Sequence, residues 1–237
     1  MGCLVPNKRL QGTPAVQHDK HRATPWRFPL RLHHHPFSAN ARKAVMTVLH
    51  TGLPVELVLV DLSKGEQRTP DFLALNPNGR VPVLETEAGP LFESNAILVA
   101  LARAAGGSLL GKSPAEELQV FQWLFWESCH FGRANGDLTW ERVIKPNFTG
   151  QPTDPNLAAQ AEDRFRVFAR TLDQTLERAA EKGPYLLGET LTVADFSLAA
   201  GLAMAGPAQI PIGDFPHLAA WFVRIQALPC WSAAQPR

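Results

Sequence analysis

The sequence predicts an α/β domain followed by an all-helical domain, and three observations lead to this fold class. Strand-like and helix-like segments alternate in the order βαβαββα between residues 29 and 107. Between residues 114 and 230 the apolar residues recur almost everywhere at helical spacing. A stretch at 106–114 that contains three glycines separates the two patterns.

The first three elements of the α/β domain are a strand, a helix and a second strand. Residues 29–35 (PLRLHHH) form a short strand candidate. Ser38 is a suitable N-cap for a helix over 38–52, which Gly52 ends. Residues 54–62 (PVELVLVDL) are a nearly continuous apolar run, which is typical of a strand buried in a parallel sheet.

The remaining elements of this domain are a short helix, a hairpin and a longer helix. We expect the short helix over 68–76 and the two hairpin strands within 80–87 and 89–93. The longer helix spans 93–107 and stops at its paired glycines. Right-handed crossovers then favour a four-stranded mixed sheet with helices on its faces.

The second part of the chain is predicted to be helical apart from one connection. Residues 114–131 and 156–183 are long amphipathic stretches, and we interpret 136–155 between them as an irregular connection. A last helix is expected over 215–229.

The helix expected over 191–206 has the most distinctive start signal. Thr192 and Asp195 have the spacing of a capping box, in which each side chain accepts from the other residue's backbone N–H. These elements divide the chain into an extension (1–28), the α/β domain (29–107), a linker (108–113), the helical domain (114–230) and a tail (231–237).

Composition limits the classes of function. The formal net charge is +1, which gives no general attraction to nucleic acid or to an anionic membrane. No apolar run approaches the ~20 residues of a membrane-spanning helix. Cys3, Cys129 and Cys230 are far apart, so neither a disulfide framework nor a zinc site is indicated, and a reducing cytoplasm fits best. Residues 1–28 are basic and rich in proline, and we expect them to be poorly ordered.

Three motifs carry a resemblance to a known family. They are LVDLSKGEQRTPDFLALNPNGRVPVLE (59–85), LFESNAI (91–97) and YLLGETLTVADFSLA (185–199). Together with the domain order, they resemble the cytosolic glutathione transferases of the phi and nu types, over about residues 29–230. The resemblance implies a thioredoxin-like N-terminal domain, glutathione as co-substrate without a cofactor or metal, and a homodimer.

Glutathione carries two carboxylates, an ammonium and a thiol, and the sequence offers partners for the γ-glutamyl end. The helix that begins near Ser94 directs its N-terminal amides and positive dipole end at an anion, and the Ser94 hydroxyl is a further donor. Glu93 is suited to the ammonium. Helix capping by Ser94 alone is the other explanation of this motif.

The resemblance implies partners for the rest of the peptide. In the family pattern Pro82 follows a cis bond, which turns the backbone of Val81 towards the cysteinyl unit; an ordinary edge-strand proline is the alternative. Gln67 and Arg68 correspond to residues that hold the glycyl carboxylate, and Arg80 is a weaker candidate. A solvated loop charge is an equally good explanation of Arg68.

The family pattern puts the thiol partner within HHHPFSANAR (33–42). Ser38 matches the catalytic serine or threonine of the phi, theta and nu types, and Asn40 matches the asparagine of the nu type. A hydroxyl or amide donor aimed at sulfur stabilises thiolate over thiol, as does a nearby helix N-terminus. The only tyrosine is Tyr185, and no cysteine lies within 33–42, which excludes tyrosine-type and cysteine-type mechanisms.

The three histidines at 33–35 are interpreted as the end of the first strand. Neighbouring strand residues alternate between faces, so His33 and His35 are expected on one side and His34 on the other. No carboxylate or cysteine is placed to complete a metal site. Only His35, the last residue before the turn, is expected near the substrates.

An apolar second substrate would meet side chains from both domains. The candidate contacts are His35, Phe37, Trp126, His130 and Trp140. Taken singly, each of them is more simply explained by a place in the helix core, and for His130 a surface position is an equally good explanation.

Three functions remain open. The first hypothesis is a glutathione transferase in which Ser38 stabilises the thiolate for attack on a small apolar electrophile. The second is a nu-like enzyme that uses glutathione to reduce disulfides or peroxides. The third is a non-catalytic binding module, since a fold does not determine a reaction.

Overall fold

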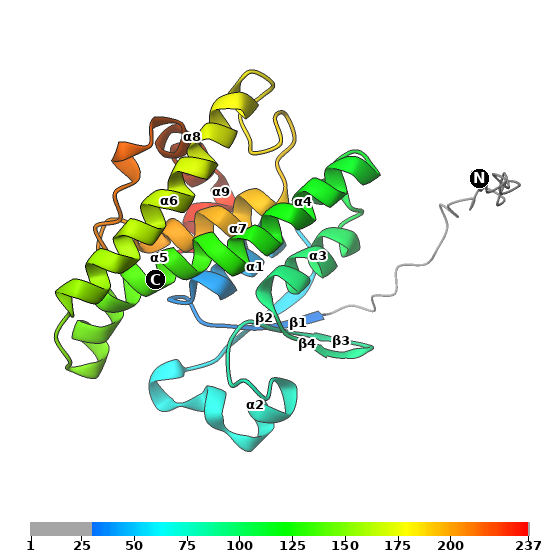
Figure 1. Ribbon diagram of the computed structural model, residues 1–237. Coiled ribbons are helices and arrows are strands. Elements are labelled where there is room, and N and C mark those ends of the chain that lie inside the picture. The colour runs from blue at the N-terminus through cyan, green and yellow to red at the C-terminus, as the bar shows by residue number, and fades with distance from the viewer. Residues whose placement is uncertain (1–29, 237) are drawn as a thin grey trace, which may run out of the picture.

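A computed structural model of the chain describes residues 30–236, which form an α/β domain and a helical domain packed against each other (Figure 1). The α/β domain contains a four-stranded sheet in the order β2-β1-β3-β4. Strand β1 is parallel to β2 and antiparallel to β3, and β3 and β4 form an antiparallel hairpin. The predicted fold class is confirmed. The extension expected at 1–28 lies outside the described residues.

The elements of the α/β domain follow the predicted order βαβαββα. They are β1 (Leu30–His34), α1 (Ala39–Thr51), β2 (Val55–Leu59), α2 (Pro70–Leu75), β3 (Val83–Thr86), β4 (Gly89–Leu91) and α3 (Ser94–Ala104). The signals at both ends of α1 act as expected. Ser38 Oγ accepts from the backbone N–H of Ala41, and Gly52 ends the helix with a φ of 67°.

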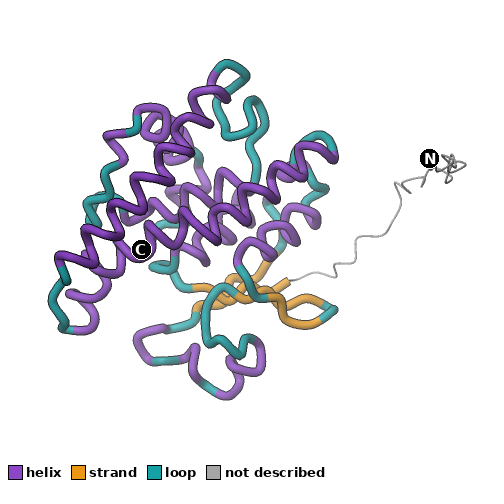
Figure 2. Tube along the Cα trace, viewed as in Figure 1, coloured by secondary structure: helices purple, strands orange, loops and turns teal. Residues whose placement is uncertain are grey.

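The two faces of the sheet have different neighbours. Helix α1 packs against α3 on one face and also against α7 of the helical domain, so it lies between the sheet and that domain. Helix α2 lies on the opposite face, as Figure 2 shows, and its Phe72 packs in a small core with Val60 and Val83. The N-terminus of α1 is thereby held at the junction of the two domains.

The expectation that the second strand is buried was wrong. Strand β2 is at the edge of the sheet, and the exposed fractions of Leu57 and Leu59 are 39% and 60%. An apolar run predicts burial only where neighbours cover both sides, and the strand order leaves β2 with a single hydrogen-bonded neighbour.

Helices make up the second domain. They are α4 (Pro114–Trp126), α5 (Gly132–Thr139), α6 (Pro155–Ala180), α7 (Val193–Gly201), α8 (Pro216–Gln226) and α9 (Pro229–Ala233). Short π-helical segments, Glu127–Phe131 and Trp140–Thr149, flank α5 and continue the path of α4. In this part of the chain no helix is both long enough and apolar enough to span a bilayer.

The expectation of an irregular connection over 136–155 was also wrong, because α5 and the second π-helical segment occupy most of this range. Gly136 and Pro146 are poor helix formers, so the local sequence argued against a helix in this range. Leu138 and Val143 are buried, and α5 packs along α6, so tertiary contacts outweigh local propensity here.

Helix α7 is the buried centre of the helical domain. The predicted capping box is present, with Thr192 N donating to Asp195 Oδ2 at 2.9 Å. Asp195 is fully buried and also accepts from Leu186 N and Trp221 Nε1, each at 2.9 Å. This carboxylate therefore joins two other segments, the turn at Leu186 and helix α8 at Trp221, to the start of α7.

Candidate active site

Two helix N-termini meet beside the hairpin. Ser38 caps α1, and its Oγ accepts from Ala41 N at 3.2 Å. The first turn of α1 carries Asn40, which is exposed. Ser94 begins α3, and its hydroxyl lies 3.4 Å from Asn40 Oδ1, within reach of a hydrogen bond. The positive ends of both helix dipoles therefore point into one region.

Glu93, the residue before α3, has an unusual backbone. Its φ of 71° lies in the left-handed region, which is rare outside glycine, and its side chain is exposed. Non-glycine residues held in this conformation are concentrated at ligand-binding and catalytic sites. Glu93 makes no side-chain cap bond to the first amides of α3, so neither these amides nor the Glu93 carboxylate is used up by capping.

A third wall comes from the loop between α2 and β3. Asn76 is 3% exposed; its Nδ2 donates to Arg80 O at 2.7 Å, and its Oδ1 accepts from Asn78 N at 3.1 Å. These bonds fold the loop back on itself. The Val81–Pro82 peptide bond that follows is cis, as the resemblance implied.

These three segments enclose a polar cavity of about 320 Å³, a volume in the range of small-molecule sites. Six predicted site residues line it: Asn40, Arg80, Val81, Pro82, Glu93 and Ser94. Asn76 and Asn78 line it too and were missed. The turn-forming sequence NPNG was the signal that this loop is tightly folded.

Gln67 and Arg68 do not line this cavity but lie directly behind its loop. They belong to a 3₁₀ turn, Glu66–Arg68, and a Cβ atom at Gly79 would lie 2.8 Å from Arg68 Nη1 and 2.9 Å from Gln67 O. Gly79, with a φ of 59°, permits this close approach. Gln67 Oε1 is buried and has no hydrogen-bond partner among the described residues.

Ser38 also lies outside the cavity lining. It is half-buried, and its cap bond uses the oxygen as acceptor, so the hydroxyl hydrogen remains available as a donor. Ser38 and Asn40 are two residues apart at the same helix end. The geometry therefore keeps both as possible donors to a sulfur atom.

A carboxylate does lie beside the histidine run, contrary to expectation. His33 Nε2 is 2.6 Å from Glu85 Oε1, because β3 runs antiparallel to β1 and brings Glu85 across. Burial lowers the pKa of His34, with smaller effects from His35 and His33. His35 turns towards Phe37, with ring centroids 5.8 Å apart. Among the described residues, no group of three or more potential metal ligands is assembled.

None of the five candidates for an apolar substrate lines the cavity. Phe37, in the loop before α1, is 67% exposed. Trp126 and His130 belong instead to an aromatic group in the helical domain, where the His130 ring stacks on Phe168 at 5.2 Å. Trp140 is 46% exposed on the second π-helical segment.

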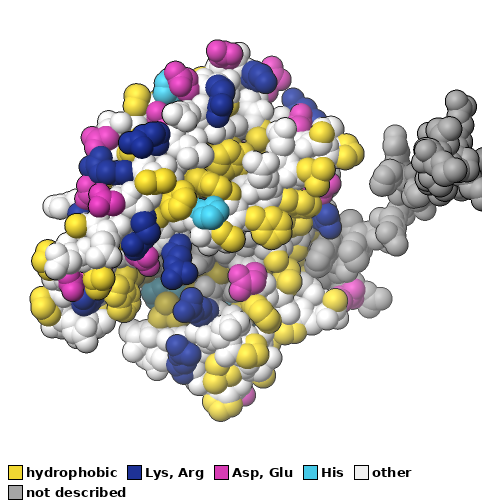
Figure 3. All heavy atoms as spheres, viewed as in Figure 1, with side chains coloured by type: hydrophobic (Ala, Val, Ile, Leu, Met, Phe, Trp, Pro, Cys, Tyr) yellow, Lys and Arg dark blue, Asp and Glu magenta, His cyan; other side chains and the backbone are white. Residues whose placement is uncertain are grey.

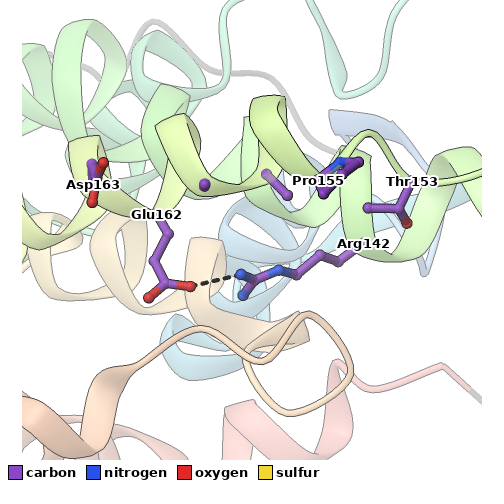
Figure 4. Close-up of a pocket in the computed structure, with 7 residues that line it drawn as sticks. Arg142, Thr153, Pro155, Glu162 and Asp163 are labelled. Atoms are coloured by element: carbon purple, nitrogen blue, oxygen red, sulfur yellow. Dashed lines mark hydrogen bonds and ion pairs between the residues drawn. The ribbon is translucent and has the colours of Figure 1, made fainter.

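The other large hollow, of about 360 Å³, lies in the helical domain (Figure 4). Its polar floor is already satisfied. Arg142 donates to Glu162 Oε2 at 2.6 Å and to the backbone O atoms of Ala208 and Gln209. Hydrogen bonds from Arg142 and Arg166 lower the pKa of Glu162. Because Arg142 and Glu162 already pair with each other, this hollow is a poorer candidate than the cavity beside α1 and α3.

Comparison with known proteins relates both domains to a single family. Residues 28–103 match the family model described as glutathione S-transferase, N-terminal domain, and residues 136–229 match the one described as glutathione S-transferase, C-terminal domain. Glutathione S-transferase F10 of Arabidopsis thaliana is 36% identical over 205 residues, which cover 83% of this chain and 92% of the plant protein.

Two further proteins are informative. The crystal structure of glutathione transferase F2 from Populus trichocarpa is similar with a TM-score of 0.76 and 26% identity, covering 87% of this chain and 97% of the poplar chain. The disulfide-bond oxidoreductase YfcG of Escherichia coli (strain K12) is 28% identical over 202 residues, which cover 82% of this chain and 89% of the bacterial protein.

Proposed function

The chain belongs to the glutathione S-transferase family and is an enzyme of that class, and from this premise we propose that it binds glutathione in the cavity beside α1 and α3. In our proposal a donor at the start of α1, first of all Ser38, stabilises the thiolate, which attacks a small apolar electrophile. The observation that carries the proposal is the meeting of two helix N-termini with a polar loop around one cavity.

The γ-glutamyl end is assigned to the start of α3. The first amides of α3 and the Ser94 hydroxyl would donate to its carboxylate, and the exposed Glu93 carboxylate would accept from its ammonium. An amino acid head group thus meets both a donor set and a carboxylate, which supports this orientation of the ligand.

The peptide backbone of glutathione is assigned to Val81. An extended ligand can pair with the backbone N–H and C=O of this residue as an added strand would. Arg80 lines the same cavity, and Arg68 and Gln67 lie behind Gly79. These residues are our candidates for the glycyl carboxylate, with Arg80 the best placed because it lines the cavity.

The chemical step follows from the thiol that remains between these ends. Its proton leaves to solvent, and the hydroxyl of Ser38, or the amide of Asn40, donates to the sulfur anion. The thiolate then forms a bond to an electrophilic carbon, and the leaving group departs with the electrons of the broken bond. Proximity of the two bound reactants contributes further to the rate.

Calorimetry followed by a kinetic assay tests this function. We expect glutathione to bind and a model aryl halide to be consumed faster with the protein than without it. Absence of binding at millimolar glutathione would overturn the whole proposal. If glutathione binds but neither an electrophile nor a disulfide is turned over, the result would support the third hypothesis, a non-catalytic binding module.

A second candidate reaction, the reduction of disulfides or peroxides by glutathione, is favoured by the similarity to the bacterial disulfide-bond oxidoreductase. The position of Asn40 in the cavity lining also supports it. A glutathione-capped disulfide, an organic hydroperoxide and an aryl halide offered in parallel separate the two reactions. Turnover of the disulfide alone would exclude the transferase reaction.

We also propose a homodimer that covers an apolar face of the helical domain. Figure 3 shows hydrophobic side chains gathered over α4 and α6. Leu118 and Phe125, seven residues apart on α4, are 69% and 71% exposed, and Val167 on α6 is 56% exposed. Sedimentation of the wild type and of Phe125→Glu tests this surface, since a dimer that uses it should dissociate when the charge is introduced.

A further inference from the structure

A buried ion pair joins the two domains behind the proposed glutathione site. Lys43 lies on α1, one turn after Asn40, and only 2% of its side chain is exposed. Its Nζ is 3.1 Å from Glu127 Oε2 and 3.1 Å from Ser197 Oγ. The pair therefore connects α1 to the first π-helical segment and to α7.

Asn95 connects this ion pair to the start of α3. Its Nδ2 donates to Glu127 Oε2 at 3.0 Å and to Leu124 O at 2.8 Å, and its Oδ1 accepts from Ser197 Oγ at 2.7 Å. The residue that precedes Asn95 is Ser94, which lines the cavity and whose hydroxyl lies 3.4 Å from Asn40 Oδ1. Asn95 therefore links the start of α3, where Ser94 lies, to the carboxylate of Glu127 in the helical domain.

We propose that the Lys43–Glu127 ion pair, acting through Asn95, positions the N-terminus of α3 for glutathione. This inference rests on the proposed function and deepens it. Neither charge touches the ligand, so both are positioning residues. They fix where Ser94 and Glu93 lie relative to the donors at the start of α1.

Stability alone is a weak explanation of this pair. Removing two charges from water costs about as much as their attraction returns, so a buried ion pair adds little net stability compared with apolar side chains. What it supplies is a restricted geometry, because both charges are buried and are held by fixed partners, Lys43 also by Ser197 and Glu127 also by Asn95. Gly132 leaves the room that this geometry needs, since a Cβ atom there would collide with the Glu127 carboxylate.

The Lys43–Glu127 pair also interacts electrostatically with the proposed glutathione site. Burial lowers the pKa of Lys43, and the carboxylates of Glu127 and Glu93 both oppose that shift. Glu93 is the residue that we assign to the ammonium of glutathione. A change in the charge at Lys43 is therefore felt at the ligand's amino acid end as well as in the bonds of Asn95.

The first test removes the link without creating a buried unpaired charge. In Asn95→Ala, the dissociation constant of glutathione should rise about tenfold, equivalent to about 1.4 kcal/mol. The value of kcat at saturating glutathione should stay within about twofold, since the groups that contact sulfur are unchanged. Unchanged affinity, or a loss confined to kcat, would overturn the inference.

The second test compares single and double changes of the charges. Lys43→Met and Glu127→Gln each leave one buried charge alone, and each should weaken glutathione binding about tenfold. The double variant K43M/E127Q is neutral, and an amide oxygen at position 127 still accepts from Asn95. We expect its dissociation constant to return to within about threefold of the wild type. A double variant that binds no better than the singles would contradict the positioning role.

Arg142→Met is the matched control. It removes one cation from a different ion pair, Arg142–Glu162, which is only partly buried, with side-chain exposures of 22% and 25%. This change should lower the thermal midpoint without altering glutathione affinity. If the wild type itself fails to bind glutathione, the proposed function fails; if it binds and the variants above bind equally well, only the positioning inference fails.

Discussion

Replacement of Ser38 separates two roles that one side chain combines in the structure. Its oxygen caps α1 by accepting from Ala41 N at 3.2 Å, and its hydrogen is free to donate to a bound sulfur. Ser38→Ala removes both interactions. Loss of the cap should cost about 1 kcal/mol, which lowers the thermal midpoint of a chain of this size by about 2–4 °C.

The catalytic loss can be estimated from the same hydroxyl. A hydrogen bond to a charged group contributes about 1.5–3 kcal/mol, so its removal should raise the pKa of the bound thiol by about 1–2 units. At about pH 6.5 the thiolate fraction then falls about 10–100-fold. A more basic thiolate is more nucleophilic, with a Brønsted coefficient of about 0.5, which leaves a net loss of about 3–10-fold in kcat.

The assay is a pH profile of kcat with an aryl halide, for Ser38→Ala beside two controls. The deficit of Ser38→Ala should disappear above about pH 9, where both enzymes hold ionised thiol. Ser38→Thr keeps the cap and the donor and should retain activity. Ser38→Asp keeps the cap but brings a negative charge to the sulfur, so it should be stable and nearly inactive. A Ser38→Ala enzyme with wild-type kcat at low pH would refute the role of Ser38 and leave Asn40 as the donor.

Three further predictions concern stability and the cavity loop. Asp195→Ala leaves several buried donors unpaired and should lower the free energy of unfolding by at least about 3 kcal/mol, which corresponds to a fall of about 6–12 °C in thermal midpoint. A fall below about 2 °C, measured by calorimetry, would exclude the claim that Asp195 holds the neighbouring segments to the start of α7. The pKa of Glu162 is held below its ordinary value of 4.5, so the stability that the ionised Glu162 contributes is complete above that pH and is lost as the pH falls. Glu162→Gln should therefore flatten the acid side of the curve of thermal midpoint against pH. An unchanged slope on the acid side would contradict this contribution of Glu162. Gly79→Ala should weaken glutathione binding about tenfold because the new Cβ displaces the cavity loop. Gly136→Ala, where a Cβ has open space around it, is the control and should leave glutathione affinity unchanged. Equal glutathione affinities in the two variants would show that the position of the loop is unimportant for binding.

Local signals in the sequence predicted much of this fold. The limits of α1 followed from Ser38 and Gly52, and the start of α7 followed from Thr192 and Asp195, because each signal acts within one turn of the chain. The edge position of β2 and the helical structure over 136–149 escaped prediction. Both depend on which segments pack beside them, and local propensity carries no information about that.

The candidate site divides in the same way. Asn40 and Ser94 were identifiable because motifs mark the start of their helices. Asn76 and Asn78 were missed because their importance lies in bonds that fold the loop over the cavity. The contact between Lys43 and Glu127 joins residues 84 positions apart, so neither spacing nor periodicity pointed to it.

Titration of glutathione bound to the wild-type protein tests the central claim most directly. The ultraviolet absorbance of the thiolate, followed against pH with the protein in excess, gives the pKa of the bound thiol. We predict a value at least about one unit below the ordinary thiol value of about 8.5. Bound glutathione that titrates at or above that ordinary value would contradict the claim that the start of α1 stabilises a thiolate.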